Sequence, residues 1–66
     1  MITIQRFATV IRVILVTDVG LGLAEASKHG KRWACTARGE DTVWVKDRAA
    51  ADTWIRKVYL AAGGAP

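Results

Sequence analysis

Hydrophobic and polar residues alternate clearly along residues 32–38 and 42–46, and both runs are rich in aromatic and β-branched side chains. A turn containing Gly39 separates the two runs. This combination predicts a β-hairpin with a three-residue turn. The turn length fixes the register of the hairpin, so we expect Arg38 to face Thr42.

The predicted register sorts the hairpin residues onto two faces. One face is apolar throughout and is expected to point into the core; it comprises Trp33, Cys35, Ala37, Val43 and Val45. The other face is mixed and comprises Ala34, Thr36, Arg38, Thr42, Trp44 and Lys46. This second face is expected to lie outside, with Trp44 beside Thr36 and Arg38.

The spacing of apolar residues becomes helical after the hairpin, which predicts a helix over residues 48–62. Its apolar stripe consists of Ala51, Trp54, Ile55, Val58 and Ala62. Asp47 is placed to accept hydrogen bonds from the first free backbone N–H groups of this helix. Gly63 is placed to end it, because glycine adopts the left-handed conformation without steric penalty.

The pattern of residues 2–17 fits two structures. Its many β-branched residues favour a strand over about 9–16. A helix also fits, because one helical stripe would hold Ile4, Phe7, Ala8, Ile11, Ile14 and Leu15. Both alternatives stay open at this point, and the strand is the preferred one.

Residues 18–29 are predicted to form a second helix, capped by Thr17 or Asp18 and weakened in its first turn by glycines. The predicted fold is therefore α+β: a single layer of about three strands, formed by the hairpin 32–38/42–46 and strand 9–16, with helices about 18–29 and 48–62. Residues 1–66 are expected to form one small domain.

The chain has 66 residues, of which 52% are hydrophobic, and it contains one cysteine. A chain this short buries a small core, so a homodimer or a partner that covers an apolar face is expected to add stability. The single cysteine argues against a secreted disulfide scaffold and favours the cytoplasm. No signal peptide or membrane span is expected, because the apolar run 10–16 is short and contains Arg12.

The sequence offers little for catalysis or for cofactors. His29 and Cys35 could form a nucleophilic pair, but a lone cysteine on an apolar strand face is more often a core residue. One cysteine and one histidine do not supply the ligands of a zinc site. Gly20 and Gly22 begin a dinucleotide-loop pattern whose third glycine is replaced by Glu25. We expect no enzyme activity, no catalytic residues, no metal and no cofactor.

The basic residues are the stronger candidates for function, because the net charge is +4 and the isoelectric point is about 9.9. The candidate binding residues are Trp44, Arg38, Lys46, Lys28, Lys31 and Arg32. An exposed tryptophan among cations can stack on a nucleic-acid base or anchor a protein interface. In the alternative structural role, Trp44 packs under another segment. The acids Glu40, Asp41 and Asp47 dilute a phosphate-binding surface, which favours a protein partner.

Residues 31–60 resemble the arm-binding module at the N-terminus of phage-type integrases, where an aromatic-rich strand, a turn and a second strand lead into a helix. The matching pieces are Lys31-Arg-Trp33, Arg38-Gly39 and Ala51-Asp-Thr-Trp54. The arm-binding module also has a long third strand before these pieces, and in this chain only residues 10–16 could form it. In size and single-domain build the chain also resembles very short phage-encoded inhibitors, including anti-CRISPR proteins.

These observations predict a non-enzymatic binding protein. The leading hypothesis is an inhibitor or regulator from a phage or mobile element that binds a host protein or nucleoprotein complex. The alternative is a basic DNA- or RNA-binding module of the integrase-arm or excisionase kind. No membrane partner is expected, and a homodimer is possible.

Overall fold

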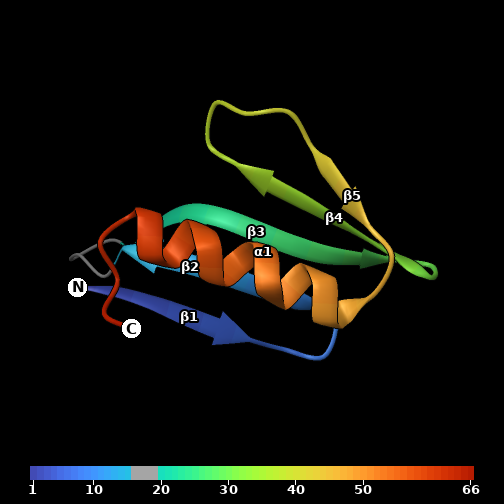
Figure 1. Ribbon diagram of the computed structural model, residues 1–66, viewed down its shortest axis with the longest axis horizontal. Coiled ribbons are helices and arrows are strands. Elements are labelled where there is room, and N and C mark those ends of the chain that lie inside the picture. Colours follow the sequence, from blue (N-terminus) through green and yellow to red (C-terminus); the bar gives the residue numbers. More distant parts are fainter. Residues whose placement is uncertain (16–19) are drawn as a thin grey trace.

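The computed structural model describes residues 1–15 and 20–66 and contains a five-stranded sheet with a helix on one face. The elements are β1 (Ile2–Arg6), β2 (Val10–Leu15), β3 (Leu21–His29), β4 (Arg32–Ala37), β5 (Val43–Val45) and α1 (Arg48–Ala61). All strand pairs are antiparallel, and the strand order β1-β2-β3-β4-β5 makes the sheet a meander. In Figure 1, α1 lies across the sheet, and both termini lie near its C-terminal end.

The expected layer of about three strands with two helices is wrong, because residues 21–29 form β3 in the middle of the sheet. The predicted start of that helix at Asp18 lies outside the described residues. Buried Ala24 and Ala26 alternate with exposed Glu25, which is the period of a strand. Pairing with β2 on one side and β4 on the other overrides the helical preference of these residues.

The strand predicted over about 9–16 is confirmed as β2, except that Thr9 belongs to the preceding turn and residue 16 lies outside the described part of the chain. The helical alternative for the N-terminal segment is wrong, because residues 2–6 form the additional strand β1. The turn between β1 and β2 consists of Phe7, Ala8 and Thr9, and Phe7 N–H donates to the Val10 carbonyl at 2.8 Å. None of these turn residues is a usual turn former, which explains why the hairpin was not predicted.

The C-terminal helix is confirmed, together with the residues that begin and end it. Asp47 accepts a hydrogen bond from the Ala50 backbone N–H at 2.9 Å, so it is the N-cap. Gly63 follows the helix with φ +97°, a backbone conformation that residues other than glycine rarely adopt. Ala51 and Ile55 of the predicted stripe are buried against the sheet.

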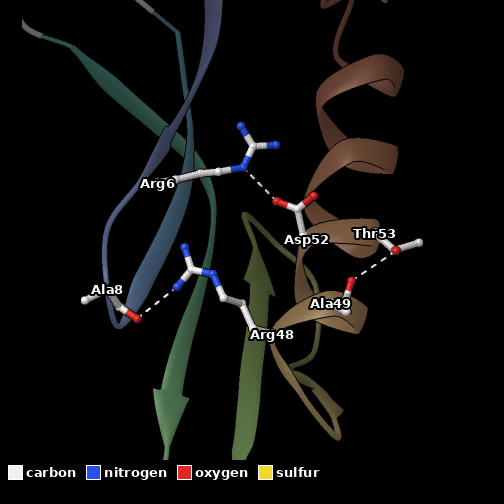
Figure 2. A network of polar contacts seen from close by, with 6 residues as sticks. All are labelled: Arg6, Ala8, Arg48, Ala49, Asp52 and Thr53. Atoms are coloured by element: carbon white, nitrogen blue, oxygen red, sulfur yellow. Dashed lines mark hydrogen bonds and ion pairs between the residues drawn. The ribbon is translucent and has the colours of Figure 1, made fainter.

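Two arginine contacts hold α1 to the N-terminal hairpin (Figure 2). Arg6 at the end of β1 forms an ion pair with Asp52 of α1, with 2.8 Å between Nε and Oδ1. Arg48 donates from Nη1 to the Ala8 carbonyl at 2.8 Å. Both contacts are at the surface, so they orient the helix more than they stabilise it.

The core lies between α1 and the sheet. Small side chains at the centre of the sheet let the helix approach closely, and larger ones fill the two sides. The buried cluster comprises Ile11, Val13, Ala24, Ala26, Trp33, Cys35, Ala51 and Ile55. The prediction that Trp33 and Cys35 point into the core is therefore confirmed, whereas Val43 of the same predicted face is 44% exposed. Within the described residues, no helix has the length and apolarity needed to cross a membrane.

Cys35 should make the free energy of unfolding fall as pH rises above the ordinary pKa of a thiol. Its side chain is 0% exposed, and burial raises its pKa. In the alkaline range the unfolded chain therefore loses this proton first, so the folded chain binds more protons and stability decreases with pH. Urea unfolding between pH 7 and 10 should show a steeper alkaline decline for the wild type than for Cys35→Ala. Equal slopes would contradict the effect of burial on this thiol.

Candidate functional site

The face of the sheet opposite α1 holds the candidate site, and we call it the open face. One row of register partners crosses it from β2 to β5: Val10, Ser27, Ala34 and Trp44. The next row contains Arg12, Glu25 and Thr36. Ser27 and Ala34 are small, so the middle of the first row is shallow and Trp44 stands at its end.

The hairpin register differs from the prediction by two residues. The structure pairs Ala34 with Trp44, and a longer loop over residues 38–42 replaces the predicted three-residue turn. A shift of two keeps every side chain on its expected face, because the side-chain period of a strand is two. It nevertheless changes the neighbours of Trp44. Arg38 is carried away from the tryptophan, and Arg32 takes its place.

Trp44 is 49% exposed, so the alternative in which it packs under another segment is wrong. The guanidinium carbon of Arg32 lies 4.7 Å from the centre of the Trp44 ring, a cation–π contact. The His29 ring meets the same indole edge-on, with centroids 5.6 Å apart and an angle of 72° between the ring planes. Ser27 Oγ lies 3.1 Å from His29 Nε2. These contacts hold the indole in one orientation while about half of it remains open.

Five of the six predicted site residues gather at one end of the sheet. This end is formed by the β3–β4 turn and the end of β5, which lie together in Figure 1. We call it the basic end and define it by Lys28, His29, Lys31, Arg32, Trp44 and Lys46. Lys28 pairs in register with Trp33, so it is on the helix side of the sheet, at the margin of the group. The sixth predicted residue, Arg38, is not part of it.

The cations of the basic end have no carboxylate partner among the described residues. The ion pairs among the described residues lie elsewhere and join Arg6 to Asp52 and Arg12 to Glu25. Asp47 is close in sequence to Lys46, but its carboxylate accepts the hydrogen bond that caps α1. Positive charge is therefore concentrated around Trp44, and no ion pair holds its cations among the described residues.

Arg38 lines an open hollow of about 700 Å³ at the other end of the hairpin. Arg12, Glu25 and Glu40 also line it, and the Arg12 Nε lies 3.7 Å from the Glu25 carboxylate. The charges of the hollow are thus of both signs. The structure separates this mixed surface from the uniformly basic one.

Two residues near Trp44 and one distant pair were absent from the predicted site. His29 and Ser27 belong to a segment predicted as helix, which hid their position on the open face. Phe7 is 52% exposed and lies under the guanidinium of Arg12, with 5.9 Å from Cζ to the ring centre. For Ser27 and His29, the available signal was the alternation along residues 21–29, which places both on the same face as Glu25.

The geometry does not assemble the nucleophilic pair considered for His29 and Cys35. Cys35 is buried under α1, whereas His29 contacts Trp44 on the open face. In the described part of the chain, no three His, Cys, Asp or Glu side chains are grouped so as to hold a metal ion. Comparisons with protein-family models, with curated proteins and with solved structures found no match for this chain.

Proposed function

We propose that this protein is a non-enzymatic binding protein whose basic end contacts the nucleic acid of a nucleoprotein complex. The observation that supports this most is the presence of Lys31, Arg32 and Lys46 at the end of the sheet that carries a half-exposed tryptophan, with Arg32 on the indole and no described carboxylate paired to these cations. Uncompensated cations attract phosphates, and an open indole supplies a surface for a base.

The positions of the acids weaken the argument that they dilute a phosphate-binding surface. Glu40 and Asp41 lie in the loop 38–42, at the opposite end of the hairpin from Trp44. Asp47 is engaged as the helix cap. Glu40 and Asp41 therefore add little negative charge at the basic end, whereas Asp47 keeps its charge directly after Lys46 while it caps α1.

We place this activity in the cytoplasm, and we propose inhibition as its consequence. A small domain seated on nucleic acid would block access of the complex to that strand. This is the regulatory role that the sequence predicts for a phage or mobile-element protein, with a nucleoprotein complex as its target.

Binding to a single-stranded oligonucleotide should weaken steeply with salt. If Lys28, Lys31, Arg32 and Lys46 each neutralise one phosphate, the logarithm of the association constant should fall against the logarithm of salt concentration with a slope of about −3. Fluorescence anisotropy of a labelled oligonucleotide between 50 and 300 mM salt, roughly the range in which counterion release is measured, gives this slope. Lys31→Gln should make it shallower, and Lys57→Gln on the exposed side of α1 should leave it unchanged.

Absence of binding at the lowest salt concentration would contradict the proposal. A second test uses the protein as bait in a bacterial lysate with and without nuclease. Capture that is lost after nuclease treatment supports contact with nucleic acid. A partner protein that is retained after nuclease, and lost with Trp44→Ala, would assign the basic end to a protein surface instead.

A further inference from the structure

We infer that the open face binds a single strand, which crosses the β-strands with one unpaired base on Trp44 and another on Phe7. This inference rests on the proposed function and specifies the form of nucleic acid. It starts from two aromatic rings that are each about half exposed, Trp44 at 49% and Phe7 at 52%. Each ring is accompanied by an arginine, Arg32 and Arg12 respectively.

The two ring–arginine pairs lie on opposite sides of a common path. Trp44 is on the edge strand β5, while Phe7 begins the β1–β2 turn and contacts Arg12 of β2. Phe7 directly follows β1 and its N–H donates to the Val10 carbonyl of β2, so the path from Phe7 to Trp44 covers four strand spacings, or about 19 Å. The residues in line with Trp44 along this path are Val10, Ser27 and Ala34. Ser27 and Ala34 are small, and Ala34 is 9% exposed. A chain of nucleotides can therefore lie flat between the two rings.

Both ends of the path carry side chains that can contact a single strand of nucleic acid. Arg32 can turn its guanidinium toward a phosphate or a base plane while remaining beside Trp44. Arg12 lies beside Phe7 and also 3.7 Å from the Glu25 carboxylate, so it offers a plane for a base more than a free charge for a phosphate. Lys46 follows β5 directly after Val45, next to the Trp44 end. The Ser27 hydroxyl, at 3.1 Å from His29 Nε2, adds a polar group in the middle of the row.

A duplex does not fit this surface equally well. Bases inside a duplex are stacked on one another, so their faces are not available to an indole or a phenyl ring. α1 is packed on the sheet through its apolar stripe and lies on the opposite side from Trp44, so it cannot read a groove at the same time. Base stacking on a flat sheet face is selective for unpaired nucleotides.

The test compares three labelled probes by fluorescence anisotropy: an eight-nucleotide dT strand, an abasic strand with the same number of phosphates, and the matching duplex. Eight nucleotides is within the range that a small sheet-based binding domain covers, roughly 4–16. The dT strand should bind at least about tenfold more tightly than the abasic strand, since each stacked base contributes severalfold or more. It should also bind more tightly than the duplex.

Alanine variants of the two aromatic residues test whether each ring stacks on a base. Trp44→Ala and Phe7→Ala should each reduce dT binding roughly tenfold while leaving abasic binding unchanged. Leu60→Ala is the matched control, because Leu60 is 48% exposed on α1, and it should change neither. Circular dichroism of each variant verifies folding, and Trp44→Phe, which keeps a ring, should retain most of the affinity.

The outcomes separate this inference from the proposed function. Equal binding of dT and abasic strands, with a steep salt dependence, would overturn base stacking and leave phosphate contact intact. Duplex binding as tight as dT binding would overturn the single-strand assignment. Absence of binding to all three probes would overturn both.

Discussion

Replacing Ile55 with alanine should lower the free energy of unfolding by about 2–5 kcal/mol, because it removes buried methyl groups and leaves a cavity. Ile55 is 0% exposed and lies where α1 meets the sheet, in the same cluster as Ala24 and Ala26. Those alanines are on rigid strands and are too small to fill the space. The cost should therefore fall in the upper part of the range, which is a large fraction of the stability of so small a domain.

Urea unfolding followed by circular dichroism measures this loss. Leu60→Ala on the same helix removes a similar side chain from a half-exposed position, and it should cost much less. Ile55→Val should fall between the two, at about 0.5–1.5 kcal/mol. Equal losses for the Ile55→Ala and Leu60→Ala variants would mean that Ile55 is not buried between α1 and the sheet.

The elements that could be predicted are those in which the local pattern and the tertiary role agree. The stripe of α1, its cap at Asp47 and its end at Gly63 are all local features, and they are present in the structure apart from Ala62, which is exposed beyond the last residue of α1. The two faces of the hairpin were also predictable, because Trp33 and Cys35 stand at alternate positions of β4, flanked by Arg32 and Thr36 on the other face.

Residues 21–29 could not be assigned from local preference, because tertiary contacts decide their structure. Ala24, Glu25 and Ala26 favour helix in isolation. In the fold, the central position of β3 requires small inward side chains so that α1 can approach, and both edges of β3 are paired. Alanines meet this requirement despite their low strand propensity. Candidate capping residues favoured a helix here, whereas burial in the structure follows the period of two of a strand, with Ala24 and Ala26 inside.

Most residues of the basic end could be named from the sequence, but the side chains that contact Trp44 could not. Trp44 and its nearby cations were singled out from charge and from the alternation of the hairpin. The length of the turn, however, could not be read from Gly39 alone, and an error of two residues exchanged Arg32 for Arg38 beside the indole. His29 joined the site only once residues 21–29 were placed as a strand. Long-range register decides which side chains meet, and local sequence constrains it weakly.

Reversing two charges at the basic end should nearly abolish nucleic-acid binding. The double variant Lys31→Glu with Lys46→Glu replaces two attractive groups with repulsive ones on either side of Arg32. Opposed like charges at an interface cost several kcal/mol, so affinity for a single strand should fall at least roughly 100-fold at low salt. Both residues are exposed, so the free energy of unfolding should change little.

The decisive comparison is a reversal of equal size elsewhere. Arg56→Glu with Lys57→Glu changes two exposed residues of α1, on the other side of the sheet. Each substitution lowers the charge by two, so either pair lowers the net charge from +4 to zero. If binding depends on the basic end, the first pair should abolish it and the second should weaken it only severalfold through the overall field. Equal losses would show that net charge alone attracts the nucleic acid, because a localised site must respond to where the charge lies as well as to how much there is.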